Sequence, residues 1–257
     1  MDLTALEIIC GFIVGLSLGL TGSGGSILAI PLLVYVLKVP MIEAIYISLL
    51  MVASIALFGA IRQSFGKNVD WKSAILFSLM GMIIAPLVVH FSKNINEELR
   101  LILFAGLMLF ASYRMMASRY QVPKAIEMQT RHTFYSIAQI SGGGAAAGAL
   151  SGFFGVGGGF IIVPLLTLIF KMPYRMAVGT SLACIFMISL SAVSSALLSD
   201  SNINLTLFIN FLIGGLIGIL SGSWLVNRLD NKKCKIIFAC LTAVMAVFMF
   251  IDKVLIH

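Results

Sequence analysis

The chain alternates long apolar runs with short polar segments. The apolar runs cover about residues 5–20, 26–38, 41–61, 73–91, 99–117, 133–153, 160–171, 175–199, 205–226 and 234–255. Most of them have close to the roughly 20 residues that cross a lipid bilayer as an α-helix. The runs at 26–38 and 160–171 are shorter, and each follows a glycine-rich break. This pattern predicts an all-α polytopic membrane protein.

The composition supports the same class of protein. Of the 257 residues, 60% are hydrophobic and 11% are charged, whereas about 25% of residues are charged in an ordinary soluble domain. A soluble domain cannot keep so much apolar surface away from water. The composition therefore excludes a water-soluble enzyme, a disordered chain and a nucleic-acid-binding module. The acidic start MDLTALEII lacks the basic region of a signal peptide, so we expect the first apolar run to stay in the mature protein.

Reactive and metal-binding side chains are few and scattered. The four cysteines form no CxxC pair, and we interpret them as buried reduced thiols; they are Cys10, Cys184, Cys234 and Cys240. The sequence contains no HExxH motif and no nucleophile with a base nearby. We therefore expect no metal, no cofactor and no enzymatic activity. No carboxylate lies at the centre of an apolar run, so a coupling ion, H⁺ or Na⁺, stays unassigned.

The two halves of the chain are related by duplication. With a shift of 133 positions, residues 11–49 align with residues 144–182. The aligned identities include six glycine pairs, two proline pairs, one lysine pair and the Ser-Leu pairs at 48–49 and 181–182. The polar segment 118–132 separates the halves. This predicts a first membrane repeat at 1–117, a linker at 118–132 and a second membrane repeat at 133–257.

The positions of the 17 Lys and Arg residues bear on topology, since such residues concentrate in cytoplasmic loops. If each glycine-broken pair returns to the side that it entered, each half adds three further crossings and the halves are inverted. Thirteen of the 17 then lie on one face and four on the other. If each pair is a single crossing, the repeats are parallel and the faces carry eight and nine. The charges favour inverted repeats, a cytoplasmic linker and extracytoplasmic termini.

Two glycine-rich motifs are the strongest local signal: GLSLGLTGSGGSILAIP at 15–31 and GALSGFFGVGGGFIIVP at 148–164. An open backbone inside a membrane is tolerated where it is buried in protein or lines a polar cavity. Short helices starting near Ser26 and Gly159 would point free N–H groups and a positive dipole end at the break, which suits an anion. We expect the substrate to be bound by Thr21, Gly22, Ser23, Gly24, Gly25, Ser26, Ser48, Gly155, Gly157, Gly158, Gly159, Thr180 and Ser181.

Structural roles compete with some of these assignments. The upstream glycines have the small-xxx-small spacing that brings helices together, and we assign to packing Gly11, Gly15, Gly19, Gly148 and Gly152. Pro31 and Pro164 break their short helices, and the sequence favours equally a plain kink and a role in gating. A hydroxyl on a membrane helix often bonds its own backbone, which is the alternative for Ser48, Thr180 and Ser181. We interpret as helix contacts the serines at 189, 191, 194 and 195.

The paired motifs GLTGSGG and GFFGVGGGF, each followed by a proline, and the stretch AVGTSL resemble the TauE/SafE sulfite exporter family, also called the toluene-sulfonate uptake permeases. The resemblance covers nearly the whole chain. It implies a multi-pass plasma-membrane protein that moves sulfite, thiosulfate, sulfonates or related small anions. It places functional weight on Gly22, Gly24, Gly25, Pro31, Gly155, Gly157, Gly158, Gly159, Pro164, Thr180 and Ser181.

Together these observations predict a secondary transporter of small anions in the plasma membrane. The fold would consist of two inverted repeats, each with a glycine-broken helix pair and three further membrane helices. The site would lie at mid-membrane between the two glycine loops, and one repeat would rock against the other. A passive anion channel and a permease for an unrelated small organic anion are the alternatives.

Overall fold

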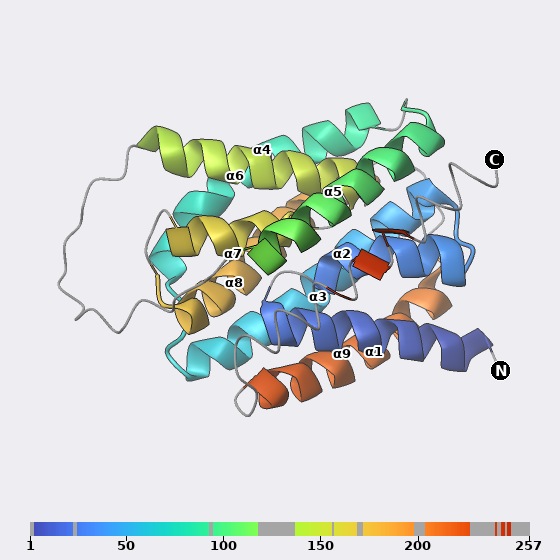
Figure 1. The fold of residues 1–257 in the computed structure, drawn as a ribbon, viewed down its shortest axis with the longest axis horizontal. Helices are drawn as coiled ribbons and strands as arrows, with labels where there is room; N and C mark the ends of the chain where they lie inside the picture. Colours follow the sequence, from blue (N-terminus) through green and yellow to red (C-terminus); the bar gives the residue numbers. More distant parts are fainter. Residues whose placement is uncertain are drawn as a thin grey trace.

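Helices packed side by side make up the part of the chain that the structure describes (Figure 1). The computed structural model describes residues 3–22, 25–92, 95–117, 137–155, 157–168, 172–197, 204–226, 240, 243–244 and 246–247. Its helices are α1 (Leu3–Thr21), α2 (Gly25–Pro31), the π-helix η1 (Leu32–Val36), α3 (Met41–Phe65), α4 (Trp71–Ser92), α5 (Glu97–Ala117), α6 (Ile137–Phe154), α7 (Gly159–Leu168), α8 (Tyr174–Leu197) and α9 (Leu205–Val226). The linker 118–132 and most of the last apolar run lie outside these residues.

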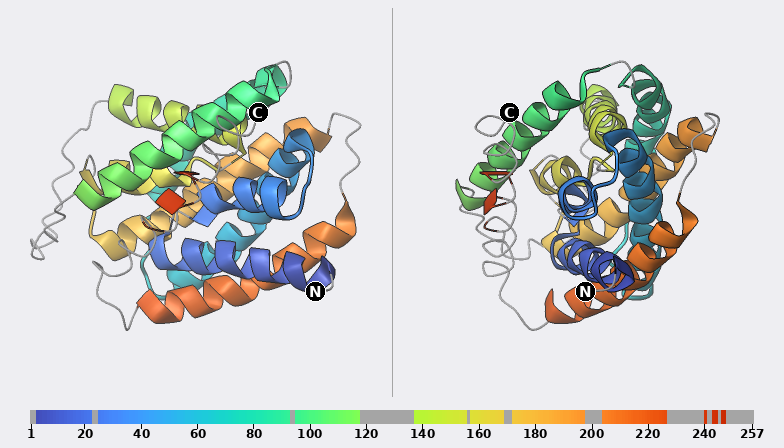
Figure 2. Two further views of the ribbon diagram at one scale, coloured as in Figure 1. Left: turned by 45° about the vertical axis from the view of Figure 1, so that its right-hand side comes forward. Right: turned by 90° about the vertical axis from the view of Figure 1, so that its right-hand side faces the viewer.

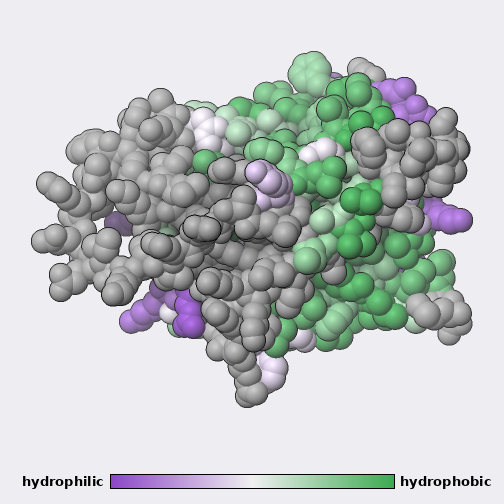
Figure 3. Space-filling model, in the orientation of Figure 1, coloured by the Kyte–Doolittle hydropathy of each residue, from purple (hydrophilic) through white to green (hydrophobic). Residues whose placement is uncertain are grey.

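Within the described residues, five helices are long and apolar enough to cross a membrane. They are Leu3–Thr21, Met41–Phe65, Trp71–Ser92, Arg175–Ser194 and Leu205–Leu225. Exposed apolar side chains form a broad surface over the helices, and hydrophilic residues gather towards the helix ends (Figure 3). The all-helical polytopic fold that the apolar runs predict is confirmed.

The two long helices that follow the glycine motifs begin in the same way. Pro40 precedes α3 and Pro173 precedes α8, and the carbonyl oxygen of each accepts the first helical hydrogen bond, from Ala44 at 2.8 Å and from Ala177 at 2.9 Å. Proline suits a helix start, because its fixed φ is compatible with the helix and a donor is not needed there. At the shift of 133, α1 to α4 correspond to α6 to α9, with α2 and η1 together corresponding to α7.

Two helix pairs join the halves closely, α1 with α9 and α4 with α6. Residue numbers rise together along both helices of each pair, so α1 is parallel to α9 and α4 is parallel to α6. Several glycines of α1 and α6 lie so close to the facing helix that a Cβ would overlap one of its carbonyl oxygens. The pairs, with the glycine of α1 or α6 first, are Gly11–Phe211, Gly15–Gly215, Gly144–Phe77 and Gly148–Gly81. Glycine therefore lets the two backbones touch, and the packing role predicted for the upstream glycines is confirmed.

The corresponding helices α3 and α8 run in opposite directions. A Cβ at Gly59 would contact Leu182, whereas one at Gly179 would contact Gln63. Since α3 also runs parallel to α9, with Gly59 against Ile219, it runs parallel to α1. The segment Gly25–Val36 between α1 and α3 must therefore double back. It lies inside the bundle in the end-on view of Figure 2, and every residue of α2 is buried.

The prediction that the cysteines are buried is correct for two of them. Cys10 and Cys184 are free and buried, but Cys240 is exposed and corrects the prediction. An apolar run in a membrane protein has a face towards lipid, so a place in such a run does not require burial. Cys234 lies outside the described residues.

Candidate functional site

Four glycines in the two helix breaks have a left-handed backbone. Their φ angles are 71° at Gly22, 68° at Gly155, 71° at Gly157 and 65° at Gly158. Side chains with a Cβ rarely adopt this conformation, so the breaks depend on glycine. Gly22 and Gly155 correspond to each other at the shift of 133, which means that both motifs turn at the same point. Ser23 and Gly24 lie outside the described residues.

Both breaks pack against the start of a long helix from the other half. A Cβ at Gly22 would lie 2.9 Å from the Cα of Val178 in α8. A Cβ at Gly155 would lie 2.9 Å from the Cα of Ile45 in α3. Neither position has room for a side chain, because the obstacle is backbone. The two contacts are equivalent under the duplication, so each loop packs against the other half of the chain.

The predicted hydroxyl residues are placed in two different ways. Ser48 donates to the carbonyl oxygen of Gly155 at 2.7 Å, and Ser181 donates to that of Gly22 at 2.8 Å. These two serines therefore hold the loops in position. The sequence suggested substrate binding or a bond to their own helix, but not this contact between the halves. Ser181 also lies 2.8 Å from the carbonyl oxygen of Val178 in its own helix.

The two threonines are buried and bond to backbone groups. Thr21 donates to the carbonyl oxygen of Ser17 at 2.9 Å, one turn earlier in α1. Thr180 accepts from the backbone N–H of Asp70 at 3.0 Å, before the start of α4. Both hydroxyls therefore form hydrogen bonds with backbone groups of the protein. Ser26, at the start of α2, is fully buried.

The second break reaches the centre of the bundle. A Cβ at Gly157 would lie 2.7 Å from the hydroxyl oxygen of Ser189 and 3.1 Å from side-chain atoms of Ile185 and Val52. Val52 is near the middle of α3, so the N-terminus of α7 begins deep inside the protein. The short helices α2 and α7 are in contact there. Gly25, Gly158 and Gly159 are buried with them.

Ser189 is a residue of this site that the sequence interpretation missed. Its hydroxyl is buried and has no hydrogen-bond partner among the described residues. The serine run was interpreted as helix contacts, and this is confirmed for Ser191, which donates to the Met82 carbonyl in α4 at 2.8 Å. Ser194 instead donates to the backbone carbonyl of Ser191 in its own helix at 2.6 Å. Only the facing Gly157 distinguishes Ser189 from its neighbours, and that contact is invisible in the sequence. The side chain of Ser195 is not among those described.

The two motif prolines differ in what surrounds them. Pro31 closes α2, and the chain continues as η1 with the wider π-helical turn, in which Leu37 donates to the Leu32 carbonyl at 3.0 Å. Such turns often absorb a missing helical hydrogen bond and occur frequently at functional sites. Pro164 lies within the helix α7, and its side chain is not among those described.

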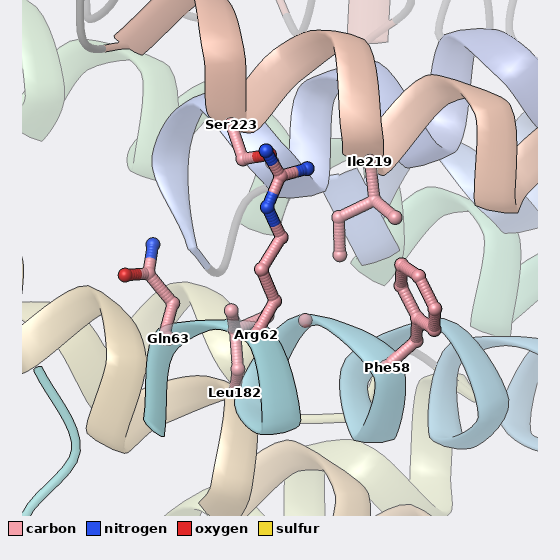
Figure 4. Close-up of a pocket in the computed structure, with 8 residues that line it drawn as sticks. Phe58, Arg62, Gln63, Leu182, Ile219 and Ser223 are labelled. Atoms are coloured by element: carbon pink, nitrogen blue, oxygen red, sulfur yellow. The ribbon is translucent and has the colours of Figure 1, made fainter. Parts of the chain in front are cut away.

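An arginine lies near the first break. Arg62 reaches from α3 across a pocket that Gly19 also lines, and donates to the carbonyl oxygen of Leu220 in α9 at 3.4 Å (Figure 4). Its side chain is exposed and lies in the last turn of α3. In the described part of the chain, no three His, Cys, Asp or Glu side chains lie together as a metal site would require.

Two charged residues are buried that the sequence interpretation did not single out. Glu7 in α1 is 6% exposed, and its carboxylate accepts a hydrogen bond of 2.7 Å from the side-chain amide of Asn210 in α9. Asn210 therefore takes part in the contact between α1 and α9. Arg100 in the first turn of α5 is 2% exposed.

Comparison with known proteins agrees with this architecture. The family described as "Sulfite exporter TauE/SafE" matches residues 7–249. A "Probable membrane transporter protein" of Xylella fastidiosa strain Temecula1 is 37% identical, and the match covers 87% of this chain and 85% of that protein. Proteins with the same description from Methanocaldococcus jannaschii and Bacillus subtilis are 26% and 27% identical, over 97% and 88% of this chain and 96% and 88% of theirs. The chain belongs to the TauE/SafE sulfite exporter family and is a membrane transporter.

Proposed function

We propose that this protein is a secondary transporter of small anions, with sulfur oxyanions and organosulfonates as its substrate class. The observation that carries the proposal is the N-terminus of α7, which begins deep in the bundle beside the Ser189 hydroxyl, a group without a hydrogen-bond partner among the described residues. The first N–H groups of a helix have no partner within it, and the helix dipole favours negative charge at this end. Backbone donors and one hydroxyl together suit an oxyanion. The family description, which names sulfite, supports this class.

The arrangement of the helices supports inverted repeats. The corresponding helices α3 and α8 are antiparallel, and both glycine-broken segments double back. In the proposed topology α1, α3 and α9 run towards the cytoplasm, and α4, α6 and α8 run away from it. The substrate would meet the α7 N-terminus from one side and the start of Gly25–Val36 from the other. Such broken helices at mid-membrane are typical of secondary transporters.

The helix packing changes the predicted moving parts. The sequence favoured rocking of one repeat against the other, but α1 is packed on α9 and α6 on α4 through backbone contacts. Each tight pair contains one helix from each half. We therefore propose that the α1–α9 pair and the α4–α6 pair are the bodies that move, with α3 and α8 between them.

Transport in reconstituted vesicles tests the proposal. We expect saturable uptake of at least one of labelled sulfite, thiosulfate and a sulfonate, measured with and without a pH gradient. Ser189→Ala is expected to reduce uptake severalfold without lowering the melting temperature, because within the described part of the chain the hydroxyl has no hydrogen-bond partner to lose. Ser194→Ala on the same helix is the control and should transport normally. Flux that does not saturate would favour a passive channel, and normal uptake by Ser189→Ala would exclude the site at α7.

A further inference from the structure

The contact between α4 and α8 contains a row of polar side chains. Where the two helices begin, Thr180 accepts a hydrogen bond of 3.0 Å from the backbone N–H of Asp70. One turn further along both segments, the buried thiol of Cys184 donates to the carbonyl oxygen of Ala74 at 3.7 Å. The hydroxyl of Ser78 follows one turn later in α4, fully buried and beside the same thiol.

This row leads towards the site proposed for the anion. Ser189 lies five residues beyond Cys184 in α8, and its hydroxyl faces Gly157 at the start of α7. Ser78 and Ser189 are both fully buried. The polar side chains therefore form a line from the end of the bundle where α4 and α8 begin to the N-terminus of α7. In the proposed topology this end faces the cytoplasm.

The duplication identifies the counterpart of the row. Gly148 of α6 packs on Gly81 of α4, and Gly15 of α1 packs on Gly215 of α9. Gly215 is thus the structural equivalent of Gly81, and the contact of α3 with α9 is the equivalent of the contact of α8 with α4. The residues that take the places of Thr180, Cys184, Ser189 and Ser78 there are Ile47, Met51, Ala56 and Leu212.

The counterpart is apolar, so the fold itself does not require polar residues at these positions. Buried polar groups between two membrane helices are costly, and they often mark the path of a substrate. An anion that leaves its water needs polar groups along its way, which an apolar contact does not supply. In the proposed function α4 belongs to a moving pair and α8 lies between the pairs, so the row lies where the two would separate.

We propose that the α4–α8 contact is the cytoplasmic section of the transport path, closed in this structure by the hydrogen bond between Asp70 and Thr180. Cys184 and Ser78 line the path when α4 moves away from α8. The inference rests on the proposed function, because it places the inner end of the path at Ser189. The alternative is that the row only fastens α4 to α8.

Thiol labelling of the full-length protein tests the path without measuring transport. Cys184 becomes the single cysteine when alanine replaces the other three, Cys10, Cys234 and Cys240. The protein is reconstituted in vesicles of defined orientation, and sulfonatoethyl methanethiosulfonate, an anion that does not cross the bilayer, is added to one face at a time. The thiolate forms a mixed disulfide with the reagent, and methanesulfinate leaves. We expect much faster labelling from the cytoplasmic face than from the outer face.

Two variants in this background test the closing contact. Thr180→Val keeps the shape of the side chain but cannot accept the Asp70 N–H. It should speed labelling from the cytoplasmic face roughly fivefold, because a hydrogen bond of about 1 kcal/mol no longer favours the closed state. Thr180→Ser keeps the acceptor oxygen and should label at the original rate.

The chain also offers a matched control in the apolar counterpart. Met51 occupies the place equivalent to Cys184 and is as fully buried. Met51→Cys, in a protein whose four native cysteines are replaced by alanine, should label far more slowly from either face. The two thiols then differ in the polarity of the contact that surrounds them.

Each outcome decides the question. Faster labelling of Cys184 than of Met51→Cys from the cytoplasmic face, with a further increase in Thr180→Val, supports the path. Equal rates for the two thiols overturn it, and so does labelling of Cys184 at equal rates from both faces, as a purely structural contact that frays would give. If Thr180→Val does not fold, the comparison of the two thiols decides alone.

The same measurements separate this inference from the proposed function. Loss of uptake in Ser189→Ala with Cys184 unlabelled would exclude the path alone. Labelling of Cys184 as expected, together with normal uptake by Ser189→Ala, would exclude the site at α7 alone.

Discussion

The hydroxyl of Ser48 donates to the carbonyl oxygen of Gly155 across a distance of 2.7 Å, although 107 residues separate them in the chain. Ser181 and Gly22 make the equivalent contact at 2.8 Å. Each half of the protein therefore holds the glycine loop of the other half. The two hydrogen bonds therefore couple the left-handed conformation of Gly22 and Gly155 to the contact between the halves.

Replacing either serine by alanine should lower stability. Each variant leaves a buried carbonyl oxygen without this donor, at a cost of about 1–3 kcal/mol. We expect a lower melting temperature in detergent and reduced uptake for Ser48→Ala and Ser181→Ala. Ser54→Ala in α3 removes only a bond of 2.9 Å to the Leu50 carbonyl in its own helix and serves as the control. A Ser48→Ala protein as stable as Ser54→Ala would contradict the positioning role.

Two glycines of α6 should respond in opposite ways to alanine. A Cβ at Gly148 would overlap the backbone of Gly81 in α4, whereas a Cβ at Gly142 would meet no heavy atom of the described residues within 4 Å. Gly148→Ala should separate α6 from α4 and reduce the yield of folded protein in the membrane. Gly142→Ala should be tolerated, and its melting temperature should stay the same or rise, since alanine favours helix over glycine by about 1 kcal/mol. Equal yields would contradict the close approach.

The pair Glu7 and Asn210 should behave as a coupled unit. Glu7→Leu leaves the Asn210 amide facing an apolar interface and should lower the melting temperature. Glu7→Gln keeps an acceptor oxygen and should lower it less. The double replacement Glu7→Leu with Asn210→Leu should recover part of the loss, because removing both partners leaves no buried polar group unsatisfied. Additive losses would show that the 2.7 Å bond does not stabilise the α1–α9 contact.

The proposed topology predicts where reporters are active. A fluorescent protein fused to the C-terminus should be dark if it is exported unfolded, and an alkaline phosphatase at the same place should be active. A fluorescent protein inserted at Gly66, between α3 and α4, should fold in the cytoplasm. A fluorescent C-terminal fusion would contradict the inverted arrangement as proposed.

The sequence was sufficient for the elements of the fold and for the location of the breaks. Long apolar runs determine membrane helices almost by length alone, and the duplication showed that Gly22 and Gly155 are equivalent. Both turned out to have φ near +70°. The glycine positions alone located the breaks, because a left-handed turn depends on the backbone conformation of the residue itself.

The contacts between the two halves could not be predicted from the sequence. Ser48 and Ser181 were singled out, but their partners are carbonyl oxygens, which every residue has. Ser189 differs from Ser191 only in what its hydroxyl faces. Arg100 was counted only among the positive charges that bear on topology, yet it is buried and its guanidinium lies against the Phe153 ring. In each case the tertiary arrangement, and not the residue type, decides the role.

The pairing of α1 with α9 and of α4 with α6 has a consequence for how the protein can be assembled and how it can have arisen. The glycine face of α1 is made at the beginning of synthesis, and its partner in α9 is made only after residue 204. A single half has no internal surface for that face. It could close its glycine contacts only with a second copy of itself lying antiparallel in the same membrane, so an ancestral half would have had to insert in both orientations before duplication joined the two copies in one chain.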